Sequence, residues 1–191
     1  MRLSNLFLIS CLAGGMAILT GPAVADALPE SCTSSATTAL SADVNVQKEA
    51  NSLFQDIRDE AIHARFRADR LRAENRSNQV DWVVQGDQLT LLRHNVNVMG
   101  AKLCKLQSIE SGLAPWQQTE IQRIAAVLPL MADNTTDAIN FLNAHQDELW
   151  LPGYHVYFHN LYSEARQVAH TSHEGVKETR LMQRQEVNPA S

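Results

Sequence analysis

The chain has 191 residues, of which 45% are hydrophobic, 19% charged and 6% aromatic, and its 16 basic and 21 acidic side chains give a formal charge of −5. This length suits one ordinary domain with its own hydrophobic core. The mild acidity and the mean hydropathy of −0.23 argue against a nucleic-acid-binding protein, a polytopic membrane protein and a disordered chain. Eight glycines and six prolines are too few for a loop-rich β protein.

The first 25 residues have the pattern of an export signal. Arg2 supplies the positive charge, and the apolar run over residues 6–19 is shorter than the ~20 residues that a membrane span needs. A Gly-Pro pair ends that run, and residues 23–25 form an A-x-A cleavage site. We therefore expect cleavage between Ala25 and Asp26, export to the periplasm or the medium, and no stable membrane insertion afterwards.

Cleavage would leave residues 26–191 and take the formal charge from −5 to −6, because the signal contains Arg2 and no acidic residue. The alternative is a lipobox that ends at Cys11, since a lipid on this cysteine would anchor the protein to a membrane. Residues 26–42 are rich in Ser, Thr and Ala and show no periodicity, which predicts a flexible arm.

Export would allow the two remaining cysteines, Cys32 and Cys104, to form a disulfide. The bond would close a loop of about 72 residues, which the chain-entropy model equates with ~4 kcal/mol of stability. Cys104 falls near the end of the second predicted helix, where the first helix begins, and an extended arm of about twelve residues reaches ~40 Å. The alternative is a buried Cys104, with Cys32 free or linked to a second chain.

Beyond the arm, apolar residues recur every three or four positions in four segments, which predicts four amphipathic helices. The first two stripes are Val46, Ala50, Leu53, Ile57, Ala61, Ala64, Ala68 and Leu71, then Trp82, Leu89, Leu92, Val96, Met99, Leu103 and Leu106, with Gln85 as a polar position. The last two are Ile121, Ile124, Leu128, Met131, Thr135, Ala138, Leu142 and His145, then Leu151, Tyr154, Phe158, Leu161, Ala165, Val168 and Ser172.

Turn and cap residues separate these segments. Polar residues 75–78 suit a turn, Gly112 suits a left-handed helix end, and Pro115 and Pro152 suit the first position of a helix. Four helices of roughly 30 residues with short connections predict an all-α, antiparallel up-down-up-down four-helix bundle over residues 43–182, followed by a frayed tail at 183–191. The alternative is a set of long coiled-coil segments in an extended oligomer.

No common motif for haem attachment, dithiol redox chemistry, zinc proteolysis, serine hydrolysis or nucleotide binding occurs in the sequence. The pattern that a di-iron carboxylate centre needs is missing too. We therefore expect no enzyme activity and no cofactor. Six arginines make the second half of the first helix basic, namely Arg58, Arg65, Arg67, Arg70, Arg72 and Arg76. Interleaved acidic residues favour a solvated face with i,i+4 ion pairs over an anion site.

Four histidines share one face of the fourth helix, namely His155, His159, His170 and His173. His155 and His159 are one turn apart and could place two imidazole nitrogens on one metal ion. His145 at the end of the third helix could join them across the hairpin, with Asp147 or Glu148 as an oxygen ligand. Zn, Cu or Ni would suit such a site. The alternative is a solvated polar face that gains charge below about pH 6.5.

Aromatic residues cluster at one end of the predicted bundle. Trp82 begins the second helix, Trp150 precedes the fourth, and Tyr154 follows in the first turn of the fourth. Such a cluster predicts a shallow binding surface for a ligand or a partner chain. The alternative is that tryptophans at helix starts close the end of the bundle.

Four short stretches, at residues 99–104, 114–117, 131–134 and 148–152, give the chain a resemblance to a group of exported bacterial all-helical proteins with no assigned activity. The resemblance covers residues 26–191 and implies export and an all-α fold only. The leading hypothesis is an exported helical bundle that binds an unknown protein or small ligand through an exposed helix face or the aromatic end, and no nucleic acid. The second is a periplasmic transition-metal-binding or pH-responsive protein that uses the histidine face.

Overall fold

The computed structural model describes residues 43–76 and 80–187, and these residues are all-helical with no β-strand. The long helices are α1 (Asp43–Glu74), α2 (Trp82–Ile109), α3 (Pro115–Ala144) and α4 (Pro152–Val187), and a short 3₁₀ helix, η1 (Glu110–Gly112), follows α2. The predicted signal with its cleavage site, Cys11, the predicted arm and Cys32 lie outside the described residues.

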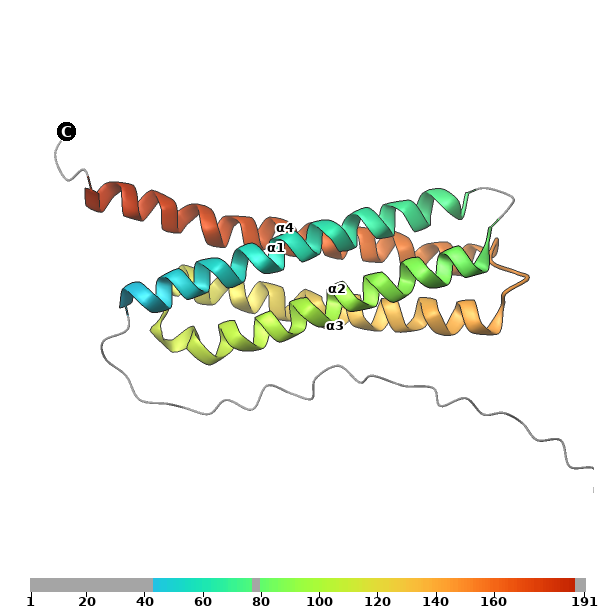
Figure 1. Ribbon diagram of the computed structural model, residues 1–191, viewed down its shortest axis with the longest axis horizontal. Helices are drawn as coiled ribbons and strands as arrows, with labels where there is room; N and C mark the ends of the chain where they lie inside the picture. Colours follow the sequence, from blue (N-terminus) through green and yellow to red (C-terminus); the bar gives the residue numbers. More distant parts are fainter. Residues whose placement is uncertain (1–42, 77–79, 188–191) are drawn as a thin grey trace, which may run out of the picture.

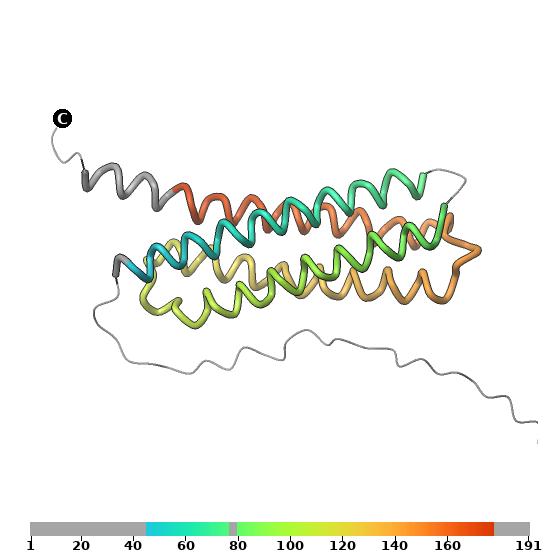
Figure 2. The backbone as a smooth tube through the Cα atoms, in the orientation of Figure 1, coloured from blue at the N-terminus to red at the C-terminus, as the bar shows by residue number. Residues whose placement is uncertain are grey.

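Each long helix packs against two others. α1 contacts α2 and α4, and α3 contacts the same two helices. Figure 1 shows the end of α1 and the start of α2 at the same end of the molecule as the α3–α4 connection, whereas η1 lies at the opposite end, near the start of α1. The chain path in Figure 2 agrees. Four helices of one chain therefore pack on each other, as expected, and the extended coiled-coil alternative does not describe this structure.

The helix ends have local causes. Asp81 caps α2, because its carboxylate accepts a hydrogen bond from the Val83 N–H at 2.9 Å. Pro115 and Pro152 are the first residues of α3 and α4, as predicted. Gly112 is not a left-handed cap but lies within η1, so that prediction was wrong. α4 continues to Val187, beyond the predicted limit of the bundle at residue 182.

The predicted apolar stripes form one continuous core along the four helices. Phe54, Phe158 and Tyr154 are among its largest fully buried side chains. Two stripe residues are exposed against the prediction: Trp82 is 47% exposed because it is the first residue of α2, and His145 is exposed because α3 has already ended at Ala144. Val46 and Leu151 are half-buried. Packing therefore follows the helical period until the helices end.

Candidate functional site

An open groove of about 640 Å³ runs between α1 and α4. Its walls carry three arginines and two histidines, together with one isoleucine and three polar or small side chains. The lining residues are Arg58, Ile62 and Arg65 on α1, and Ser163, Arg166, Gln167, Ala169, His170 and His173 on α4. The groove volume lies within the range of ~300–1,000 Å³ that is usual for ligand sites.

The helical period explains why these residues line the groove. Residues 58, 62 and 65 are spaced by four and three, so they lie on one face of α1, next to its buried stripe. Beneath them that stripe consists of small residues, because Ala61 and Ala64 are fully buried, and Ala165 is their counterpart on α4. Small side chains let two helices approach closely, so the longer side chains on either side form the walls of the groove.

The charges in the groove are only partly compensated. Arg58 forms an ion pair with the adjacent Asp59, with 2.8 Å between Nη2 and Oδ1. Arg65 and Arg166 have no carboxylate partner in the part of the chain that the structure describes. The groove is therefore a locally cationic surface on a chain that carries a net negative charge.

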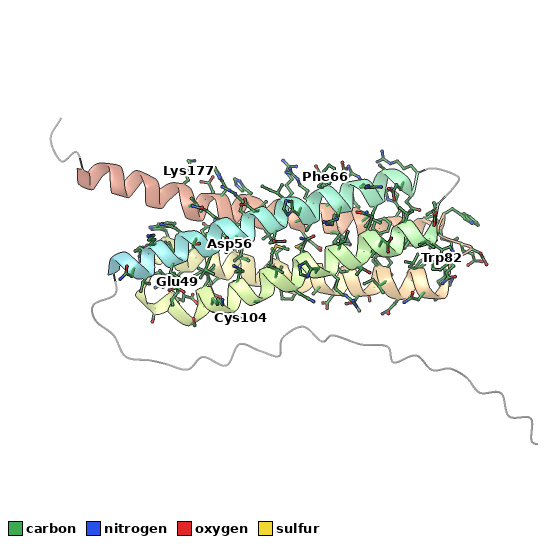
Figure 3. The ribbon with its side chains drawn as sticks, in the orientation of Figure 1. Glu49, Asp56, Phe66, Trp82, Cys104 and Lys177 are labelled. Atoms are coloured by element: carbon green, nitrogen blue, oxygen red, sulfur yellow. The ribbon has the colours of Figure 1, made fainter. Side chains whose placement is uncertain are left out.

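An apolar strip borders this cationic surface. Ile62 lines the groove and is 39% exposed, and Phe66, one turn further along α1, is 70% exposed. Figure 3 labels Phe66 on the second half of α1. Cationic and apolar groups on one exposed face are typical of surfaces that bind an anionic, partly apolar partner.

The other side of α1 is different, because its polar side chains are bonded to α2. The Arg67 Nε–H donates to Asn95 Oδ1 at 3.0 Å, and Asn95 Nδ2 donates to Glu60 Oε2 at 2.6 Å. Lys102 on α2 forms an ion pair with Asp56, which Figure 3 labels on α1. These polar groups of α1 and α2 therefore satisfy each other and leave little for a ligand.

A similar polar contact joins α3 and α4. Asn134 Nδ2 donates to Glu164 Oε1 at 2.7 Å, while Glu164 Oε2 is buried without a hydrogen-bond partner among the described residues. Burial raises the pKa of the Glu164 carboxyl above its usual value, the hydrogen bond from Asn134 lowers it, and the nearby charge of Asp133 raises it. Neither Asn134 nor Glu164 lines the α1–α4 groove, so this contact belongs to the α3–α4 interface.

The three histidines of the predicted metal site are not brought together. His145 is the C-cap of α3, where its ring packs on Phe141 at 4.6 Å between centroids and its Nδ1 lies 3.3 Å from Glu148 Oε2. His155 and His159 lie on α4. Within the described ranges, no group of three or more His, Cys, Asp or Glu side chains is placed to hold a metal ion. The structure therefore gives no support to the predicted Zn, Cu or Ni site, which stays a prediction.

The predicted aromatic surface is divided by the packing. Trp82 and Trp150 are exposed, at 47% and 69%. Tyr154 is fully buried, stacks on Phe141 at 5.0 Å and meets Phe158 edge-on at 4.6 Å. Its hydroxyl donates to Gln85 Oε1 at 3.3 Å, and burial raises the pKa of its phenol. Tyr154 is a core residue, so it does not contribute to an exposed binding surface as predicted.

Comparison of the chain with known protein families, curated proteins and solved structures finds no match. None of the helices in the described ranges combines the length and apolar composition that crossing a membrane requires. The α1–α4 groove is the candidate functional site. The sequence had indicated its parts separately, as an arginine-rich half of the first helix and a histidine face on the fourth, but not that these surfaces adjoin.

Proposed function

We propose that this chain is an exported, non-catalytic binding protein that holds its ligand or protein partner in the α1–α4 groove. One observation carries the proposal: Arg65 and Arg166 line the groove from two different helices, and neither has a carboxylate partner among the described residues. Arginine is common at binding surfaces, because its planar guanidinium bonds carboxylates and phosphates with two parallel hydrogen bonds. Exposed Ile62 and Phe66 supply apolar contact area beside it.

The proposal includes an antiparallel up-down-up-down arrangement of the helices. Two contacts between α1 and α4 support it. A Cβ on Gly175 would lie 3.0 Å from the Phe54 ring, and the Arg72 guanidinium lies 4.6 Å from the Tyr162 ring centroid. Residue numbers rise on α1 and fall on α4 between these two contacts, as expected for neighbours that run in opposite directions.

Export is part of the same proposal, and it is supported by the sequence of residues 1–25. We also propose a disulfide between Cys32 and Cys104 in the exported form. Cys104 lies on α2 toward the end of the molecule at which α1 begins (Figure 3). Alkylation of the exported protein without reduction should leave both cysteines unmodified, and alkylation after reduction should label both. Labelling of both cysteines before reduction would contradict the disulfide.

Site-specific crosslinking tests the groove as the binding surface. The photo-reactive amino acid p-benzoylphenylalanine would replace Phe66 in one variant and Leu130 in a control variant. Leu130 lies on α3 and is 52% exposed, so it offers a comparable exposed apolar position outside the groove. After irradiation of producing cells, intact mass should show an adduct at position 66 and none at position 130.

The adduct at position 66 should also disappear when Arg65→Glu and Arg166→Glu are introduced together, because the charge of the groove is then reversed. Circular dichroism would show that the double variant keeps its helices. Equal labelling at positions 66 and 130, or no adduct at position 66, would contradict the proposed function.

A further inference from the structure

The cationic groups of the groove occupy two levels along the helices. The contacts of Phe54 with Gly175 and of Arg72 with Tyr162 fix which turns of α1 and α4 lie opposite each other. Interpolation between these contacts places Arg65 at the level of Arg166, and Arg58 at the level of His173. At 1.5 Å per residue, seven residues separate the two levels by ~10 Å along the helix axes.

The two levels differ in how much unpaired positive charge they carry. Arg65 and Arg166 have no carboxylate partner in the described ranges, so this level is strongly cationic. Arg58 at the other level is already paired with Asp59, and the exposed imidazole of His173 adds a polar group. A ligand should therefore place its main negative charge at the Arg65 and Arg166 level.

Apolar side chains occupy the space between and beside these levels. Ile62 lies between Arg58 and Arg65 in the groove wall, and Phe66 follows one turn later with 70% of its surface exposed. A ligand that matches this pattern has acidic groups about 10 Å apart with an apolar group between them. On an α-helix, residues seven positions apart lie on the same face and are separated by ~10 Å.

A groove between two packed helices is also a surface on which a third helix can lie, with its apolar side chains in the groove. The lining of the groove extends over eleven residues of α4, from Ser163 to His173, and the ten steps between them correspond to ~15 Å, or nearly three helical turns. A single small anion would contact only one of the two levels. The length, charge and apolar strip together fit an extended acidic partner better.

We infer that the groove binds an acidic amphipathic helix of a partner protein, with two carboxylates seven residues apart and an apolar residue between them. This inference rests on the proposed function, because it names the ligand class of the same groove. The carboxylate at one level bonds Arg65 and Arg166, the second competes with Asp59 for Arg58, and the apolar residue packs on Ile62 and Phe66.

Three fluorescein-labelled helical peptides test the inference by fluorescence anisotropy with the purified protein. The first has two Glu residues seven positions apart with Leu between them, in an Ala and Gln background. The second has Gln in place of both Glu residues. The third keeps both Glu residues but places them on opposite faces. We expect the first to bind at least about tenfold more tightly than the other two, with an affinity that falls as salt rises.

The protein variants supply the matching control. Arg65→Gln combined with Arg166→Gln should weaken binding of the first peptide by at least about tenfold. Arg123→Gln should change it less than about twofold, because Arg123 is an exposed arginine on α3 that pairs with Glu120 away from the groove. Circular dichroism and the unfolding midpoint would show that all variants remain folded.

The other outcomes overturn the inference in distinguishable ways. Equal binding of the Glu and Gln peptides would show that the groove does not select acidic partners, although the groove would still be a binding surface. Binding of decanoate with loss in the Arg65→Gln, Arg166→Gln variant, but no peptide binding, would identify a small amphiphilic acid instead of a helix. Absence of peptide and decanoate binding, together with no adduct at position 66, would overturn both this inference and the proposed function.

Discussion

The two sides of α1 use similar residues for different purposes. On the side that faces α2, Arg67 donates to Asn95, and Asn95 donates to Glu60. On the side that faces the α4 groove, Arg65 has no carboxylate partner in the described ranges. The two arginines are only two residues apart, so their different environments come from their positions around the helix.

This contrast separates residues that hold the fold together from residues that are available to a ligand. A part-buried polar group that is bonded across an interface costs free energy when its partner is removed, because it is then left desolvated and unpaired. An exposed cation without a partner has no such bond to lose. Substitutions on the α1–α2 side should therefore change stability, and substitutions in the groove should change binding.

The largest effect should come from the core beneath the α1–α4 face. Phe54→Ala should lower the free energy of unfolding by about 3–5 kcal/mol, because a fully buried ring is removed and a cavity remains. Phe66→Ala is the matched control and should change it by less than about 0.5 kcal/mol, since Phe66 is 70% exposed. Urea unfolding measures both values, and similar losses in the two variants would contradict the packing described for α1.

The α1–α2 bridge, formed by the hydrogen bonds of Asn95 with Arg67 and Glu60, should give the next largest effect on stability. Asn95→Ala removes the bonds to Arg67 and Glu60 and should destabilise the protein by about 1–2 kcal/mol. Asn140→Ala, at an exposed position of α3, should stay within about 0.5 kcal/mol of the parent protein. If the two asparagine variants unfold at the same urea concentration, the bridge contributes no measurable stability.

The two arginines provide the sharpest form of the comparison. Arg67→Gln should cost about 0.5–1.5 kcal/mol of stability, because its hydrogen bond to Asn95 is lost. Arg65→Gln should leave stability unchanged within about 0.5 kcal/mol and should weaken binding in the groove. Thermal unfolding and peptide anisotropy on the same samples measure both properties. A stability loss at Arg65 equal to that at Arg67 would remove the distinction between the two sides.

The smallest effect should occur at the α3–α4 contact and should depend on pH. Burial raises the pKa of Glu164, so the charged form is less stable in the folded protein than in the unfolded chain. Glu164→Gln should therefore stabilise the protein by a few tenths of a kcal/mol at pH 7, a small value because the side chain is partly exposed to solvent. The gain should vanish as the pH falls below the usual pKa of glutamate, where both side chains are neutral. A gain that persists at pH 3 would show another cause.

Much of the fold could be read from local periodicity. The stripe that begins with Val46 and Ala50 predicted α1, and Pro115 and Pro152 marked the starts of α3 and α4. These signals depend on neighbours within one or two helical turns, so they do not require knowledge of the tertiary structure. The same reasoning failed at the helix ends, where His145 continued the period in the sequence after the helix itself had stopped.

The sequence by itself determined that there are four amphipathic helices and which face of each is buried, because both follow from side-chain spacing along one chain. Only the tertiary structure decided that Arg67 meets Asn95, 28 residues away, that Tyr154 is enclosed by aromatic neighbours, and that Arg65 and Arg166 line one groove. The physical reason is that side-chain pairing, burial and exposure depend on which helices become neighbours and on which turns of those helices lie opposite each other. Those are relations between distant segments, and the period of a single helix does not contain them.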